Sequence, residues 1–228
     1  MIQKAHEAYN NRDFTTAFEL YNKLAEQNNA EAMTSLGFMY QNEKGCIQDD
    51  AMALELYERA SLLEHPLAYF NLAILYMNGL GGVVHDQFKA HDLYMQAAIR
   101  EVVPAMYEVA LMLERGLGCL QNFSEAAFWY EEGAKRGHLE SFNNLGVLYK
   151  DGHGVVQDEA RCFICFSRAA EGGLAEGLYN LGQLHDQGIG CEIDHDKALE
   201  LCRQAAFKGH VKAKEIIKNL QEDGKIVF

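Results

Sequence analysis

The stretch from Leu145 to Asp158 decides the fold, and it reads Leu-Gly-Val-Leu-Tyr-Lys-Asp-Gly-His-Gly-Val-Val-Gln-Asp. Its opening Leu-Gly pair has counterparts at Leu36-Gly37, Leu72-Ala73, Val109-Ala110 and Leu181-Gly182. From the first pair to the last, with Leu145-Gly146 as the fourth, successive pairs are 36, 37, 36 and 36 residues apart. Its closing residue, Asp158, has counterparts at Asp49, Asp86, Asn122 and Asp194. Successive members of this second set are 37, 36, 36 and 36 residues apart. Two independent ladders with one period indicate a tandem repeat of helical size.

Each repeat is expected to form two helices. The first has small and apolar residues at helical spacing and ends at a glycine, because a helix end often needs the left-handed backbone that glycine adopts at little cost. These glycines are Gly79, Gly116, Gly152 and Gly188. A second glycine two residues later is expected to keep the loop tight. The aspartate or asparagine of the second ladder is then expected to cap the start of the second helix.

This pattern resembles the Sel1-like repeat, a relative of the tetratricopeptide repeat with a longer hairpin loop. The match is nearly complete at Leu145-Gly146, Tyr149, Gly152-His153-Gly154-Val155, Asp158 and Ala169-Ala170. Departures are Glu43 for the first loop glycine, Leu113 and His185 for the tyrosine of the first helix, and Cys202 for the aromatic residue of the second helix. The resemblance implies an all-α fold, a right-handed α-solenoid of helix hairpins (an α/α superhelix).

The resemblance covers roughly residues 31–212. We expect five repeats there, at about 31–66, 67–103, 104–139, 140–175 and 176–212. Residues 1–30 are interpreted as a tetratricopeptide-like hairpin that caps the N-terminal end. Residues 213–222 are interpreted as a C-terminal capping helix with lysines on its outer face, and residues 223–228 as a tail.

The charge balance argues against two classes of partner. Twenty lysines and arginines against thirty-three aspartates and glutamates leave a formal net charge of −13, which repels nucleic acid and anionic membrane surfaces. No apolar run reaches the roughly 18–20 residues that span a bilayer. The residues after Met1 lack the apolar region of a signal peptide, so a cytoplasmic location is expected if Met1 is the natural start. A removed signal peptide stays an alternative.

The cysteines and histidines favour no particular chemistry. Cys46, Cys119 and Cys191 occupy the loop position that valine fills in two other repeats, and Cys162 and Cys165 replace core residues of a second helix. Three further candidates, His65, His138 and His210, share one turn position between repeats and are interpreted as polar turn residues. We therefore expect no catalytic residue, no metal, no cofactor and no enzymatic activity. A metal- or thiol-dependent regulator or hydrolase built on the repeats is the alternative.

The site most open to prediction is a groove along the first helices. By analogy with tetratricopeptide arrays, its walls fall near the third, seventh and tenth positions of those helices. Apolar and aromatic candidates are Phe38, Phe70, Ile74, Tyr107, Leu111 and Tyr179, and polar candidates beside them are Asn71, Glu108, Asn144 and Asn180. The polar side chains could hydrogen-bond the main chain of an extended peptide. The alternative is that the apolar ones pack between repeats.

These observations predict a non-enzymatic scaffold or adaptor that binds a partner peptide or helix. The acidic total favours a neutral-to-basic protein partner with apolar anchor residues. A spacer role or a weak homo-oligomer remains open.

Overall fold

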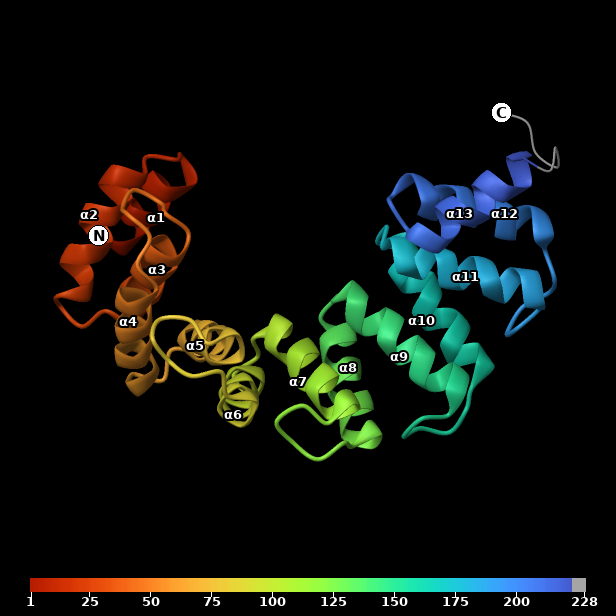
Figure 1. Cartoon of the computed structure of the whole chain (residues 1–228), viewed down its shortest axis with the longest axis horizontal. Helices are drawn as coiled ribbons and strands as arrows, with labels where there is room; N and C mark the ends of the chain where they lie inside the picture. The colour runs from red at the N-terminus through yellow and green to blue at the C-terminus, as the bar shows by residue number, and fades with distance from the viewer. Residues whose placement is uncertain (223–228) are drawn as a thin grey trace. The chain divides into compact units, whose positions relative to one another are not determined.

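A computed structural model of the chain describes residues 1–222, in which all regular secondary structure is α-helical (Figure 1). The helices are α1 (Ile2–Asn10), α2 (Phe14–Ala25), α3 (Ala30–Gln41), α4 (Asp50–Leu62), α5 (Pro66–Asn78), α6 (Gln87–Ala98), α7 (Val103–Arg115), α8 (Phe123–Lys135), α9 (Leu139–Asp151), α10 (Glu159–Glu171), α11 (Ala175–Gln187), α12 (His195–Phe207) and α13 (Val211–Glu222). The predicted all-α class is confirmed. The tail predicted at 223–228 lies outside the described residues.

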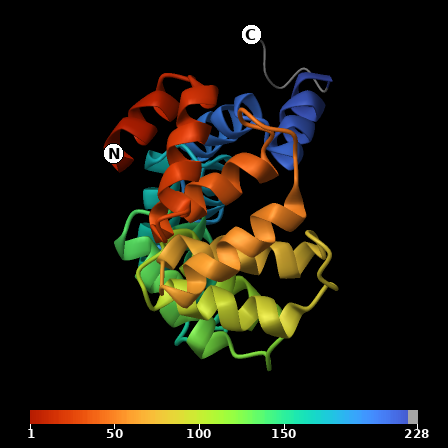
Figure 2. The same cartoon turned by 90° about the vertical axis from the view of Figure 1, so that its left-hand side faces the viewer.

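The helices form two compact units. The first comprises residues 1–121 with α1 to α7, and the second begins at Asn122 and contains α8 to α13. Within each unit every helix packs against the next one along the chain, and α3 also contacts α5. Figure 2 shows the hairpins α1–α2, α3–α4 and α5–α6 following one another in the first unit. This arrangement places the first helices of successive hairpins next to one another.

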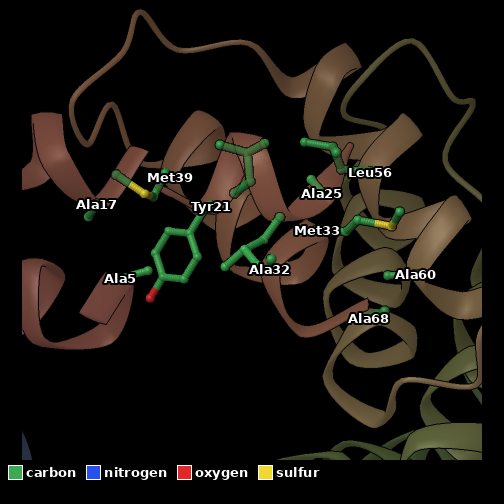
Figure 3. Close-up of a cluster of buried hydrophobic side chains, with 12 residues drawn as sticks. Ala5, Ala17, Tyr21, Ala25, Ala32, Met33, Met39, Leu56, Ala60 and Ala68 are labelled. Atoms are coloured by element: carbon green, nitrogen blue, oxygen red, sulfur yellow. The ribbon is translucent and has the colours of Figure 1, made fainter. Parts of the chain in front are cut away.

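A buried core joins the first two hairpins of the first unit and reaches Ala68 on α5 (Figure 3). Its members are Ala5, Ala17, Tyr21, Leu24, Ala25, Ala32, Met33, Leu36, Met39, Leu56, Ala60 and Ala68. The alanines let the helices approach closely, and the two flexible methionine side chains fill the irregular space that remains. This core holds α3 in place, and α3 carries Phe38 on its other side.

The helix ends lie where the two residue ladders predict them. The side chains of Asp49, Asp86, Asn122, Asp158 and Asp194 each accept a hydrogen bond from the amide three residues later, at 2.8–3.2 Å. Gly79, Gly116, Gly152 and Gly188 close the first helices with φ of 66–71°. Both predictions are confirmed. Glu43, which replaces the first loop glycine, also has a positive φ of 54°.

The second loop glycine has a role beyond keeping the loop tight. A Cβ atom on Gly118 would lie 2.1 Å from the carbonyl oxygen of Gln87, the first residue of α6. The same kind of approach, to the first residue of the second helix of the preceding hairpin, recurs at Gly45, Gly81, Gly154 and Gly190. Glycine at this position therefore lets the loop of one repeat lie directly on the backbone of the preceding repeat.

Candidate functional site

A cavity of about 420 Å³ opens on the first unit beside α1, α3 and α5; we call it the first-unit cavity. Its walls are His6, Tyr9, Tyr21, Glu31, Thr34, Ser35, Phe38, His65, Leu67, Phe70 and Asn71. Three of the predicted groove residues, Phe38, Phe70 and Asn71, are among them. The structure therefore brings together side chains that the sequence places 32 and 33 residues apart.

The walls of the first-unit cavity are largely apolar and remain accessible. The side chains of Phe38 and Leu67 are 41% and 49% exposed, although both residues lie on helices whose opposite faces are buried. The lining contains one carboxylate, Glu31, whose Oε1 lies 3.5 Å from Nε2 of His6. No lysine or arginine is among these lining residues. The cavity thus presents exposed apolar surface beside a negative charge.

Two polar contacts stabilise the wall of the first-unit cavity. Nδ1 of His65 lies 3.0 Å from the hydroxyl of Thr34, which itself donates to the carbonyl oxygen of Ala30 at 2.9 Å. Burial lowers the pKa of His65, and the nearby carboxylate of Glu31 offsets part of that effect. Since its ordinary value is 6.5, the imidazole is neutral at pH 7 and adds no positive charge to the cavity.

Five polar residues at one position of successive first helices form what we call the polar ladder: Ser35, Asn71, Glu108, Asn144 and Asn180. All except Glu108 are hydrogen-bonded to their own chain. Asn71 is hydrogen-bonded to the hydroxyl of Tyr57, which donates to Oε1 of Gln41 at 2.7 Å. The equivalent Ser35 is hydrogen-bonded to Tyr21. In each case the tyrosine comes from the second helix of the preceding hairpin. Part of the hydrogen-bonding capacity expected to serve a bound peptide is therefore used to join neighbouring helices.

The second unit shows the same device and one variation. Nδ2 of Asn144 donates to the hydroxyl of Tyr130 at 3.0 Å. The residue equivalent to that tyrosine in the next repeat is Phe166, which has no hydroxyl group, and Asn180 donates instead to Oδ1 of Asn143 at 2.8 Å. Where the tyrosine hydroxyl is absent, the amide of Asn180 thus pairs with an amide on the preceding first helix.

Tyr179 borders two cavities on the second unit. One, of about 450 Å³, lies between α11, α12 and α13; the other, of about 740 Å³, also includes Asn180, His210 and Lys212. The ring of Tyr179 stacks on that of His210 with centroids 4.3 Å apart. Ile74 on α5 and Tyr107, Glu108 and Leu111 on α7 are half-buried and line none of these three cavities.

Part of the first-unit cavity was missed by the sequence reasoning. His6, Tyr9 and Tyr21 belong to the N-terminal hairpin, which was interpreted as a cap. Their residue types carry no distinct signal. Treating α1 as one more first helix of the array would have added its side chains to the groove.

Comparison with known proteins places the repeats in a family. The model of the family described as Sel1 repeat matches residues 11–29, 30–65, 66–100, 103–138, 143–174 and 175–210. This chain belongs to the Sel1 repeat family. Five of the Sel1 matches each run over one pair of consecutive helices from α3 to α12, and the sixth lies on α2. Among curated proteins, none matches this chain.

Solved structures share the Sel1 repeat fold. A Sel1 repeat protein from Oxalobacter formigenes has a TM-score of 0.90 at 24% identity, over 96% of this chain and 87% of that one. The c5321 protective antigen of uropathogenic Escherichia coli has a TM-score of 0.59 at 28% identity over 92% of this chain, which spans 53% of that antigen's length. A Sel1 repeat protein from Klebsiella pneumoniae has a TM-score of 0.55 at 16% identity, over 90% of this chain and 99% of that one.

Two of the three histidines between Sel1 repeats, His138 and His210, cap helix starts, whereas the side chain of His65 makes no such cap. Nδ1 of His138 accepts the amide of Ser141, and Nδ1 of His210 accepts that of Ala213, both at 3.2 Å. Burial lowers the pKa of His138, with a smaller opposing effect from Glu140. Because an acceptor nitrogen must be unprotonated, these contacts fit neutral imidazoles. The interpretation as polar turn residues thus acquires a specific structural role.

None of the six cysteines, all of which lie within the described residues, forms a disulfide, and Cys162, Cys165 and Cys202 are buried. Cys162 and Cys165 are buried within α10, and burial raises the pKa of the two thiols to about 11 and about 12. Burial also raises the pKa of the loop thiols Cys46 and Cys191, whose Sγ atoms lie 3.5 and 3.7 Å from backbone carbonyl oxygens. At neutral pH these groups are therefore protonated rather than nucleophilic thiolates.

No group of three or more histidine, cysteine, aspartate or glutamate side chains within residues 1–222 is arranged to hold a metal ion. In the same range, no helix is both long and apolar enough to cross a lipid bilayer.

Proposed function

We propose that this protein is a non-enzymatic scaffold that holds a peptide or helix of a partner protein against the first helices of its N-terminal unit. Sel1 repeat proteins generally mediate protein–protein interaction and are typically not enzymes. The proposal adds a location, the face of α1, α3, α5 and α7, and a partner chemistry.

The first-unit cavity is the observation that carries the proposal. It combines an accessible aromatic ring, Phe38, with an accessible aliphatic side chain, Leu67, and with the ring of Phe70. Binding hot spots are typically pockets that bury a large apolar anchor of the partner and exclude water around it. A volume of about 420 Å³ accommodates one or two bulky side chains.

The charge of the first unit further restricts which partner segments can bind. Residues 1–121 contain eight lysines and arginines against sixteen aspartates and glutamates. An acidic surface accelerates association with basic segments and disfavours acidic ones. The partner segment is therefore neutral to basic, with at least one bulky apolar residue.

The test selects ligands from a phage-displayed library of random peptides, about 12 residues long, on the purified chain. Selected peptides are then titrated against Phe38→Ala and against Phe38→Ala with Phe70→Ala. We expect each removal of an aromatic anchor to weaken binding by at least about tenfold, because truncated hot-spot residues typically cost 2 kcal/mol or more. Phe88→Ala is the matched control, since Phe88 is 72% exposed on α6 and lines none of the three cavities.

Circular dichroism of each variant shows whether the helices are intact. Peptides that bind the folded double variant as tightly as the original protein would rule out the first-unit cavity as the binding site. If Phe88→Ala lost binding while the Phe38 and Phe70 variants kept it, the binding site would lie on the second helices instead.

The alternative function requires a reactive thiolate or a bound metal. Native mass spectrometry of the purified protein tests it, because a stoichiometric metal or cofactor would revive a regulator or hydrolase built on the repeats. No contact described above favours that function over the scaffold.

A further inference from the structure

One residue of the polar ladder differs from the rest. Ser35, Asn71, Asn144 and Asn180 are all hydrogen-bonded within the chain. The member on α7 is Glu108, a carboxylate where the others are a hydroxyl or an amide. No hydrogen bond or ion pair joins its side chain to any residue in the range 1–222.

The surroundings of Glu108 make the lack of a hydrogen-bond partner unfavourable. The side chain is half-buried, and burial raises its pKa, while Arg115 two turns along α7 attracts it without forming an ion pair. A carboxylate that has lost part of its hydration and has no donor nearby is unfavourable in the isolated protein. The carboxylate of Glu108 is therefore available to pair with a donor from outside the chain.

Tyr94 supplies a second polar group at the same place. In the preceding repeat the hydroxyl of Tyr57 is held between Gln41 and Asn71. The residues equivalent to those two partners are Met77 and Glu108, and no hydrogen bond is found for the hydroxyl of Tyr94 within residues 1–222. The negative charge of Glu108 is close enough to add to the effect of burial in raising the pKa of Tyr94.

This polar pair is connected to the first-unit cavity. The ring of Phe70, which lines the cavity, packs against the ring of Tyr94 with centroids 5.6 Å apart. Aromatic side chains therefore run from the exposed Phe38 through Phe70 to Tyr94, whose ring is buried, and Glu108 lies close enough to Tyr94 to raise its pKa.

We propose that Glu108, with the hydroxyl of Tyr94, binds a lysine or arginine side chain of the partner segment whose bulky apolar residue fills the first-unit cavity. This inference rests on the proposed function and names the feature of the partner that gives specificity. The cation gains a charge-assisted hydrogen bond to a carboxylate that is already partly desolvated and held in place, which lowers the cost of forming the pair. An acidic or wholly apolar segment would leave Glu108 half-buried and unpaired, because neither offers a hydrogen-bond donor to a carboxylate.

The experiment uses the same phage-displayed library of random peptides, selected in parallel on the original chain, on Glu108→Gln and on Glu58→Gln. Glu58 is an exposed carboxylate on α4 and lines none of the three cavities, so its variant loses the same charge elsewhere in the same unit. Peptides from the original chain should carry lysine or arginine at a constant distance from a bulky apolar residue. Peptides from Glu108→Gln should keep the apolar residue and lose the basic one.

Affinities complete the test. A selected peptide should bind Glu108→Gln at least about tenfold more weakly than it binds Glu58→Gln. Replacing its basic residue by methionine should make its affinities for the original chain and for Glu108→Gln equal, as expected when the two side chains form one pair. The thermal midpoint of Glu108→Gln should equal or exceed that of the original chain, because an unpaired, half-buried charge is removed.

The possible failures are distinguishable. If no peptide depends on Phe38 and Phe70, the proposed function fails and this inference fails with it. If peptides depend on those two residues but carry no basic residue, or bind Glu108→Gln unchanged, only the role of Glu108 is overturned. A lower thermal midpoint together with lost binding would also overturn it, since that result assigns Glu108 to the fold.

Discussion

Replacing Gly118 by alanine tests whether the second loop glycine sets the packing between neighbouring repeats. Three glycines of the first unit allow a matched comparison, because all have a left-handed backbone: φ is +88° at Gly82, +69° at Gly116 and +66° at Gly118. They differ in what a new Cβ atom would meet. At Gly82 nothing lies within 4 Å, at Gly116 the nearest atom is 3.4 Å away, and at Gly118 the carbonyl oxygen of Gln87 is 2.1 Å away.

The magnitudes follow from two separable costs. Alanine in the left-handed region costs about 1–2 kcal/mol, and that cost applies to all three sites. Only at Gly118 must the loop also move off the first turn of α6, and the overpacking of a close contact adds about 1–3 kcal/mol. We therefore expect a loss of about 2–5 kcal/mol for Gly118→Ala and of about 1–2 kcal/mol for Gly82→Ala and Gly116→Ala.

Urea unfolding followed by far-ultraviolet circular dichroism measures these losses as shifts of the midpoint at an unchanged slope. Equal losses at the three glycines would refute the reasoning, because they would mean that backbone conformation alone requires glycine in this loop. A larger loss at Gly116 would likewise show that the helix end, and not the contact with the preceding repeat, dominates.

Three further predictions follow from burial and titration. Leu145→Ala should cost about 2–5 kcal/mol, since Leu145 is 4% exposed in a central repeat, whereas Leu220→Ala in the half-buried last helix should cost distinctly less; equal shifts of the urea midpoint would contradict nearest-neighbour packing of the repeats. The pKa of His138 lies below its ordinary value of 6.5, so its contribution to stability is complete above pH 6.5 and declines as the pH falls from there toward the folded-state pKa. His138→Asn keeps an acceptor for the amide of Ser141 but does not titrate, so it should reduce the fall of the urea midpoint between about pH 7 and about pH 5, and an undiminished fall would assign that titration to other groups. Cys162 and Cys165, with pKa values raised to about 11 and about 12, should resist a thiol-labelling reagent at neutral pH until urea unfolds the chain, and rapid labelling in the native protein, detected by mass spectrometry, would show that α10 is not packed as described.

The repeat and its helix boundaries could be predicted from the sequence because they depend on local interactions. An aspartate that caps a helix contacts an amide only three residues away, as Asp49 does with Met52, and a glycine that ends a helix needs only its own backbone freedom. A period of 36 or 37 residues then repeats these local signals along the chain. The analogy with tetratricopeptide arrays predicted that Phe38, Phe70 and Asn71 line one groove, because the third and seventh positions of a first helix lie one turn apart on the same face.

Only the tertiary structure decided which of these residues meet and which polar groups are already paired. Asn144 pairs with a residue 14 positions away, Thr34 contacts His65 31 positions away, and Asn180 pairs with a residue 37 positions away. Each of these contacts depends on how two helices pack and not on local pattern. The contact of Gly118 with Gln87 and the unpaired state of the Glu108 carboxylate likewise cannot be predicted from the repeat pattern of the sequence. The physical reason is that backbone propensities and caps act within one or two turns, whereas burial and hydrogen-bond pairing between repeats are set by the distances at which the helices pack.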